Sequence, residues 1–239
     1  MSAIHVGNTI KITGSNRHPR SDDLLVRHMG TDESVLDIGA SDGSTSVDLI
    51  HKLTGFRSYF IADLFLSVTA REVGGMTVFF APDGTAILLV GRRTLAWPSQ
   101  SVVVRNLYWI VLRRAARQKG SATKVLLLNP AAQALIQVDP RVDYRVHDVF
   151  EPWNGPPPTV IKVANLLRRL YFPDHEILRA LGVIRDSLPE GGLLLMVDNP
   201  RIAGIQERGA LYRRVGQRFE PIATTEHEPE VHDLVVAMA

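Results

Sequence analysis

A turn with two glycines follows a short apolar run early in the chain. It reads Asp37-Ile38-Gly39-Ala40-Ser41-Asp42-Gly43, and we expect it to join a buried strand over residues 34–39 to a helix over residues 44–53. Such a turn lets a ligand approach both the backbone and the N-terminus of the helix. The two aspartates would repel a pyrophosphate, so the turn favours a cationic ligand.

The spacing of the glycines narrows the choice of ligand. Gly39 and Gly43 are separated by three residues, whereas dinucleotide-binding turns follow the pattern G-x-G-x-x-G. S-adenosylmethionine carries a sulfonium and an ammonium group, so charge selects it over a nicotinamide dinucleotide. A nicotinamide-dependent reductase is therefore the weaker alternative.

Strands and helices alternate on both sides of this turn. We predict a helix over 22–29, a strand over 59–63 and, later in the chain, helices over 131–137 and 175–187 alternating with strands over 124–128, 144–149, 159–164 and 193–197. Segments 210–214, 218–223 and 232–237 indicate antiparallel strands at the end. The pattern predicts an α/β fold with a doubly wound, mostly parallel seven-stranded sheet.

The middle of the chain interrupts this alternation. Two strands over 77–80 and 85–90 flank the turn 81–84, a third strand is expected over 94–97, and a long helix over 102–118. We interpret 1–239 as a single domain with a β-hairpin and helix inserted over 70–123. The insertion is expected to form a lid or to bind the acceptor. The helix over 102–118 is alternatively a membrane-surface contact or a core-packed helix with a solvated basic face.

The first turn resembles the E/D-x-G-x-G-x-G motif of class I S-adenosylmethionine-dependent methyltransferases, with Ser41 in place of the middle glycine. Three further segments, 147–150, 161–165 and 188–195, resemble that family in the same order, so the similarity covers roughly 22–70 and 124–239. The resemblance implies a Rossmann-like methyltransferase fold with S-adenosylmethionine as cofactor. It also implies that the methionine end of the cofactor is lined by Asp37, Gly39, Ala40, Ser41 and Gly43.

The resemblance also implies contacts for the rest of the cofactor. Asp63 would hold the ribose hydroxyls, and Asp148 and Val149 would contact the adenine. One alternative is open, in which 124–128 is the second strand of the sheet and Asn129 holds the ribose. We prefer Asp63, because a carboxylate makes the stronger hydrogen bonds to paired hydroxyls. The strand ending at Ala164 and Asn165 is expected to face the reactive methyl group.

The implied activity is methyl transfer to an oxygen or nitrogen of a small-molecule acceptor, giving S-adenosylhomocysteine. The sequence does not identify a catalytic base, and His147 and His175 are only candidates for that role. Residues 164–167 lack the N-P-P-Y type sequence of many nucleic-acid amino methyltransferases, and a net charge of +2 does not indicate a nucleic-acid binder. The alternatives are a cofactor-binding partner module without catalysis and a methyltransferase acting on a lipid or quinone at a membrane surface.

Composition sets outer limits on the function. The 239 residues are 45% hydrophobic and include no cysteine, which excludes disulfides, cysteine zinc sites and thiol nucleophiles. No H-x-x-x-H spacing occurs, so we expect no metal site.

We expect neither a signal peptide at 1–10 nor a transmembrane segment, and hence a cytoplasmic protein. Arg168 and Arg169 are expected either to bind an anionic substrate or to face solvent. The oligomeric state is not predicted.

Overall fold

The computed structural model describes residues 4–6, 9–11, 16–118, 122–200, 202 and 204–238. The chain divides into two compact units. The main unit comprises 14–64 and 129–239, and the insertion unit comprises 1–13 and 65–128. The sequence predicted a single domain with an insertion over 70–123, so the inserted segment is longer at both ends than expected.

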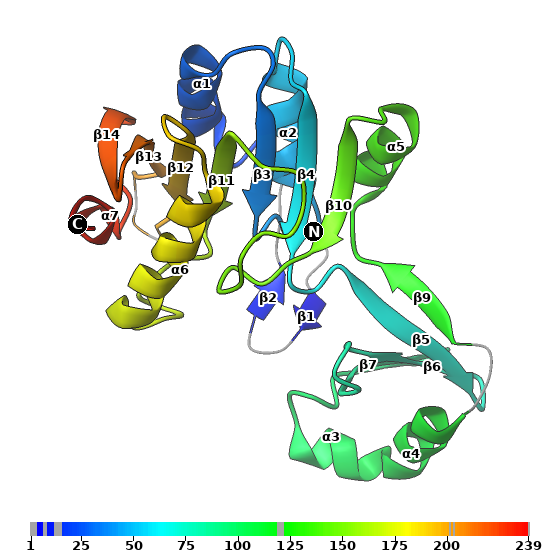
Figure 1. Cartoon of the computed structure of the whole chain (residues 1–239). Coiled ribbons are helices and arrows are strands. Elements are labelled where there is room, and N and C mark those ends of the chain that lie inside the picture. The colour runs from blue at the N-terminus through cyan, green and yellow to red at the C-terminus, as the bar shows by residue number, and fades with distance from the viewer. Residues whose placement is uncertain are drawn as a thin grey trace. The chain divides into compact units, whose positions relative to one another are not determined.

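The main unit contains a seven-stranded sheet whose spatial order is β10-β4-β3-β11-β12-β13-β14 (Figure 1). Its first five strands are parallel, and the last two are antiparallel to their neighbours. The sheet is thus mixed, and its mostly parallel character agrees with the sequence prediction. The strands are β3 (Ser34–Ile38), β4 (Ser58–Asp63), β10 (Val142–Val146), β11 (Val160–Ala164), β12 (Leu193–Asp198), β13 (Arg208–Val215) and β14 (Arg218–Thr224).

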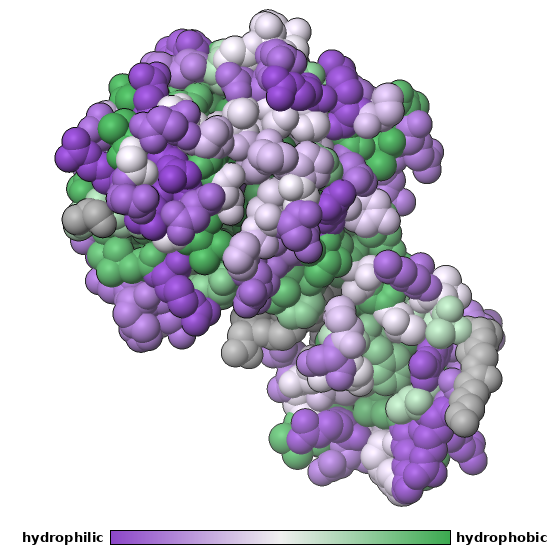
Figure 2. Space-filling view, in the orientation of Figure 1, coloured by the Kyte–Doolittle hydropathy of each residue, from purple (hydrophilic) through white to green (hydrophobic). Residues whose placement is uncertain are grey.

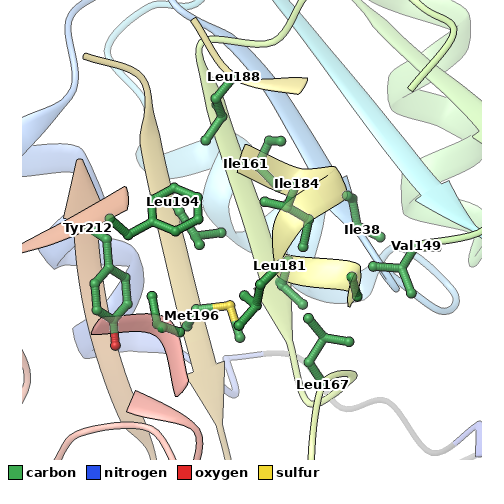
Figure 3. Close-up of a cluster of buried hydrophobic side chains, with 14 of the residues drawn as sticks. Ile38, Val149, Ile161, Leu167, Leu181, Ile184, Leu188, Leu194, Met196 and Tyr212 are labelled. Atoms are coloured by element: carbon green, nitrogen blue, oxygen red, sulfur yellow. The ribbon is translucent and has the colours of Figure 1, made fainter. Parts of the chain in front are cut away.

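Helices cover both faces of this sheet. On one face, α6 (Asp174–Ser187) and α7 (His232–Val236) pack against the largest hydrophobic cluster, which includes Ile38, Ile161 and Met196 from alternate positions of three strands (Figure 3). Because successive strand residues point to opposite faces, the residues between these face the other layer. That layer holds α1 (Pro19–His28), α2 (Ser44–Lys52) and α5 (Pro130–Val138).

The order of the strands creates one reversal of direction in the sheet. From β3 the chain moves to β4 and then β10 on one side, and afterwards to β11 and β12 on the other. β3 and β11 are neighbours at this reversal. In open α/β sheets, ligands bind outside the carboxyl ends of the strands at such a switch point. The glycine turn that follows β3 lies at this position.

The insertion unit has a five-stranded antiparallel sheet in the order β8-β7-β6-β5-β9. The helix α4 (Trp109–Arg117) packs on this sheet through a cluster that contains Val78, Leu89 and Ala115. The helix α3 (Val102–Leu107) precedes α4 and contacts it. The unit also contains the short β1 (Ile4–Val6) and β2 (Thr9–Lys11), which pair with each other. The five strands are β5 (Ser67–Val73), β6 (Met76–Phe80), β7 (Ala86–Gly91), β8 (Thr94–Ala96) and β9 (Thr123–Leu126).

Two predictions for the insertion were wrong in detail. The helix expected over 102–118 is two helices separated at Tyr108, whose φ of −101° and ψ of 12° depart from helical values. The strand expected over 124–128 is β9, and it pairs antiparallel with β5 rather than in the main sheet. The alternative that made this segment the second strand of the main sheet is therefore excluded, since β4 pairs directly with β3.

The last predicted strand, 232–237, was also wrong. Residues His232–Val236 form α7, and both Val231 and Val235 are buried in the main core. Side chains four residues apart lie on one face of a helix, so this short segment fills the core as a helix although its valines favour a strand. None of the helices that the structure describes is long and apolar enough to cross a membrane.

Candidate functional site

The glycine turn is a tight loop fixed to the end of β4. Gly39, Ser41 and Gly43 have positive φ angles of 75°, 59° and 79°, a conformation that glycine adopts without a steric penalty and serine rarely does. The amides of Gly39 and Ala40 both donate to the carbonyl of Ala62, at 2.8 and 3.1 Å. The loop is thereby held at the switch point of the sheet with its backbone in a defined shape.

Asp63, the last residue of β4, holds the centre of this loop. Its Oδ2 accepts a hydrogen bond of 2.8 Å from the backbone amide of Ser41, and the side chain is almost buried. The carbonyl of Asp63 accepts from the amide of His147 at 3.1 Å, which connects β4 to the end of β10. The sequence-predicted residues at the ends of these neighbouring strands therefore lie close together.

Asn129 lies against the same loop from the start of α5. Its backbone amide donates to the carbonyl of Asp42 at 2.8 Å, and its Nδ2 donates to the hydroxyl of Ser44 at 2.9 Å. Its Oδ1 accepts from the amide of Ala132 at 2.8 Å and caps α5. Both polar groups of the Asn129 side chain are thus engaged within the fold.

The segment after β10 places the residues predicted for adenine. Asp148 is half-buried and its Oδ1 accepts from the amide of Phe150 at 3.0 Å, while Val149 is part of the main core. His147 packs edge-on against Trp153 with ring centroids 5.1 Å apart. Burial lowers the pKa of His147, an effect opposed by the nearby charge of Asp148. His147 is consequently neutral at pH 7.

A polar cluster lies at the end of β11, and Asn165 is the one member of it that the sequence predicted as a site residue. Asn165 has a φ of 58°, and its Oδ1 accepts from the amide of Asn199 at 2.7 Å. In return, the Nδ2 of Asn165 donates to the Oδ1 of Asn199 at 2.7 Å. Asn199 follows β12 directly, so the two asparagines join the carboxyl ends of neighbouring strands. Ala164, the other residue predicted here, is half-buried at the end of β11.

His18 completes this cluster from the start of α1. Its Nε2 lies 2.8 Å from the Oδ1 of Asn199 and 3.1 Å from the Nδ2 of Asn165, and only 2% of the residue is exposed. The Nδ1 is buried and has no hydrogen-bond partner among the described residues. Burial and the charge of Lys162 lower the pKa of His18 to about 3, so the imidazole is neutral. In the sequence, Pro19 indicates that a helix starts at this point, but nothing indicates that His18 contacts the two asparagines.

A buried ionic network lies beneath the loop, in the layer between the sheet and α1 and α2. Lys162 on β11 is fully buried and donates to Asp22 of α1 at 2.9 Å. It is the register partner of Asp37 on β3. Burial lowers the pKa of Lys162, but the charges of Asp37 and Asp22 outweigh burial and raise it. A lysine in the middle of the apolar run 160–164 was the sequence signal for this network, because buried charges need partners.

Asp37, which the resemblance places at the methionine end of the cofactor, is buried beneath the loop. Only 1% of the residue is exposed, and its Oδ2 accepts from the hydroxyls of Ser46 at 2.7 Å and Tyr59 at 2.9 Å. Its Oδ1 is buried and has no hydrogen-bond partner among the described residues. Because Asp37 points into the helix layer, it supports β3 and the loop from within and does not line an open surface.

The remaining candidates lie outside this set of contacts. His175 is exposed in the first turn of α6. Arg168 pairs with Glu230 at 3.2 Å, and Arg169 pairs with Asp174 at 2.9 Å and Asp233 at 2.7 Å. The two arginines therefore hold the loop after β11 against α6 and the chain around α7. Among the described residues, no three His, Cys, Asp or Glu side chains are grouped so that they could hold a metal ion.

Comparison with known proteins adds structural matches only. No family model matches the chain, and no match was found among curated proteins. The matching solved structures include the methyltransferase CalH with S-adenosylhomocysteine (16% identity, 74% of this chain and 34% of that one, TM-score 0.38). They also include the S-adenosylmethionine-dependent methyltransferase SibL (15%, 75% and 36%, 0.40) and human N-acetylserotonin methyltransferase with S-adenosylmethionine (12%, 76% and 34%, 0.39).

The chain spans about a third of the length of these three proteins. They are methyltransferases, the family that the sequence motifs resemble. At TM-scores of 0.38 to 0.40 the matches carry no weight in assigning an activity or a substrate to this chain. Any such assignment depends on the residues of the chain itself.

Proposed function

We propose that the main unit binds S-adenosylmethionine at the carboxyl ends of β3, β4 and β10 and catalyses methyl transfer. The observation that carries the proposal is the loop after β3, held at the switch point by Asp63 through the amide of Ser41 at 2.8 Å. A rigid loop of small residues beside a strand-end carboxylate suits a ligand with a cationic end and a ribose.

The residues fit the cofactor in a definite order. The backbone of Gly39, Ala40, Ser41 and Gly43 would face the methionine end, and Asp63 would accept hydrogen bonds from the ribose hydroxyls. Asp148 and the backbone of Val149 would contact the adenine. Asp63 is favoured over Asn129, because both polar groups of Asn129 already cap α5 and brace the loop. Asn129 and the buried Asp37 are then positioning residues.

When bound, S-adenosylmethionine supplies an activated methyl group whose transfer to the acceptor leaves S-adenosylhomocysteine. The chain contributes mainly alignment of the two reactants and exclusion of water. The cluster of His18, Asn165 and Asn199 fixes the backbone after β11, the segment expected next to the reactive methyl group. His147 is neutral because burial lowers its pKa, so it can accept a proton from a hydroxyl acceptor. The exposed His175 is the weaker candidate.

The acceptor is proposed to be a small molecule that is methylated on oxygen or nitrogen. Residues 164–167 read Ala-Asn-Leu-Leu, without the two prolines of the N-P-P-Y type sequence. This departure argues against a nucleic-acid base as acceptor. The second candidate is a cofactor-binding module without catalysis.

Calorimetric titration with S-adenosylhomocysteine tests the binding site. Asp63→Asn keeps an acceptor for the Ser41 amide but removes the charge, and we expect it to weaken binding about tenfold or more, which is about 1.4 kcal/mol. Asp143→Asn, the same change at an exposed position of β10, is the matched control. The proposal fails if the parent protein does not bind, or if both variants bind as the parent does.

A second measurement separates an enzyme from a binding module. Transfer of a labelled methyl group from S-adenosylmethionine would be followed with a panel of phenol, amine and carboxylate acceptors and with a lipid and a quinone. Labelled product identifies the acceptor class. Tight binding without transfer to any acceptor would favour the non-catalytic module. Competition by NAD would indicate the nicotinamide alternative.

A further inference from the structure

The α3–α4 segment of the insertion unit exposes a row of large apolar side chains. Val103 is 76% exposed and Leu107 is 72% exposed. Figure 2 shows apolar and hydrophilic side chains side by side on the surface of this unit. We call the exposed set the apolar stripe, and it consists of Val102, Val103, Leu107, Trp109 and Ile110.

The stripe is separate from the side of α4 that packs on the sheet of the insertion unit. That side is formed by Tyr108, Val111, Leu112 and the buried Ala115, which contact the cluster around Val78. Val103 and Leu107 are four residues apart in α3, so they lie on one face of that helix, and Trp109 and Ile110 are exposed at the start of α4. The two helices therefore carry a second apolar face that the described fold does not cover.

Positive charge surrounds this stripe. Residues 84–128 of the insertion unit contain no aspartate or glutamate and eight lysines or arginines. Four of the arginines are exposed on α3 and α4. The guanidinium of Arg113 lies 5.9 Å from the ring centroid of Trp109, an arrangement in which a cation borders the apolar face. The four arginines are Arg105, Arg113, Arg114 and Arg117.

We propose that the α3–α4 surface docks on a membrane that contains anionic lipids. Aliphatic side chains and a tryptophan insert favourably at the boundary between headgroups and acyl chains, and arginines beside them bind the anionic headgroups. The 45 residues 84–128 carry no negative charge that such a surface would repel. The inference does not depend on the proposed methyl transfer.

Two other occupants fit the surface less well. A two-fold interface with a second copy would set these arginines against the same arginines, without an acidic residue of 84–128 to pair them. Nucleic acid would satisfy the arginines but leave Val103, Leu107 and Ile110 in contact with water or phosphate. A lipid surface satisfies both the charges and the apolar side chains.

Flotation of the full chain with lipid vesicles tests the proposal. The vesicles are phosphatidylcholine alone and an equal mixture of phosphatidylcholine and phosphatidylglycerol. We expect the protein to float with the mixture and to remain with the soluble fraction when phosphatidylcholine is used alone. Raising the salt from about 0.15 to about 1 M shortens the screening length from about 8 to about 3 Å and should weaken the binding.

Matched variants locate the binding surface. The triple change Val103→Ser/Leu107→Ser/Ile110→Ser should reduce partitioning by about tenfold or more, because each change removes apolar carbon from the interface. Its control is Val138→Ser/Val146→Ser/Leu170→Ser, where the residues are 78%, 64% and 68% exposed in the main unit. The control should float as the parent does.

A charge variant tests the arginines separately. Arg114→Gln/Arg117→Gln should weaken partitioning by about fivefold for each arginine, because each contributes about 1 kcal/mol near an anionic surface. Arg27→Gln/Arg213→Gln makes the same change in net charge at exposed positions of the main unit, and it should have no such effect.

Three results would overturn the proposal. The first is absence of flotation with the anionic vesicles. The second is flotation that neither α3–α4 variant reduces. The third is occupation of the surface by another partner without vesicle binding, seen as self-association in sedimentation that the triple serine variant abolishes, or as binding to a labelled oligonucleotide.

Discussion

Leu166 lies directly over Gly39: a Cβ added at residue 39 would be 2.9 Å from the Cδ2 of Leu166. Gly39 follows β3 and Leu166 follows β11, the two strands that meet at the switch point of the sheet. The absence of a side chain at 39 therefore lets the two segments approach each other. It also permits the φ of 75° that begins the loop.

We predict that Gly39→Ala destabilises the protein through both effects. The left-handed φ costs roughly 1–2 kcal/mol, and crowding against Leu166 adds about 1–3 kcal/mol. Gly216→Ala is the control, since Gly216 has a φ of 60° and nothing within 4 Å of an added Cβ. Urea unfolding should give a larger loss for Gly39→Ala. If Leu166→Ala does not restore part of it in the double variant, the crowding argument is wrong.

Removal of Lys162 should destabilise the main unit strongly. Lys162→Met leaves Asp22 charged and buried without its partner, a change that typically costs 3–5 kcal/mol. Lys52→Met, which removes the more exposed pair with Asp23, should cost less than about 1 kcal/mol. The free energy of unfolding measures both, and Lys162→Met/Asp22→Leu should recover most of the loss. Additive losses in that double variant would contradict a coupled pair.

His18 should make the protein less stable in acid. Its pKa is about 3 in the folded protein, against 6.5 for an unperturbed histidine, so below pH 6.5 the unfolded chain binds the extra proton. Stability therefore falls by about 1.4 kcal/mol per pH unit from pH 6.5 toward pH 3. His18→Gln should lose about 2 kcal/mol less than the parent between pH 7 and pH 5. The exposed His175→Gln should retain the parent's full dependence, and equal slopes in all three proteins would refute the assignment.

Asn165 combines a left-handed backbone with side-chain bonds to Asn199, and two substitutions separate these contributions. Asn165→Gly removes the bonds but tolerates the φ of 58°, whereas Asn165→Ala loses the bonds and keeps the steric penalty. We expect alanine to be about 1 kcal/mol less stable than glycine in thermal or urea unfolding. Equal stability of the two variants would show that the backbone at 165 relaxes.

Much of the main sheet was predictable because its strands have strong local patterns. The run 193–197 is continuously apolar, and 34–38 is a short run rich in apolar residues that Gly39 ends; both are buried parallel strands. The strand Ser67–Val73 was missed, although Val68 and Ala70 are buried at alternating positions. That alternation was the available signal.

The predictions that failed concern segments whose structure depends on contacts distant in sequence. The pattern of residues 124–128 predicts a strand but not the sheet to which it belongs, which is decided by pairing with β5. Val235 favours a strand by propensity but is helical because of its place in the core against α6. In the candidate site, Asp63 and Asn129 were named but their hydrogen bonds to the loop were not. His18 and Asn199 are 181 residues apart, so no local pattern connects them.

The inserted segment leaves and rejoins the main unit through neighbouring strands. β5 begins it and β9 ends it, and Ser67 is the register partner of Leu126, so the two crossings are separated by about the 4.8 Å of adjacent strands. Because its two ends are adjacent, the segment can be exchanged, lengthened or lost in evolution without changing the path of the surrounding sheet. Joining residue 64 to residue 129 through a short glycine-serine linker would make that exchange in the laboratory.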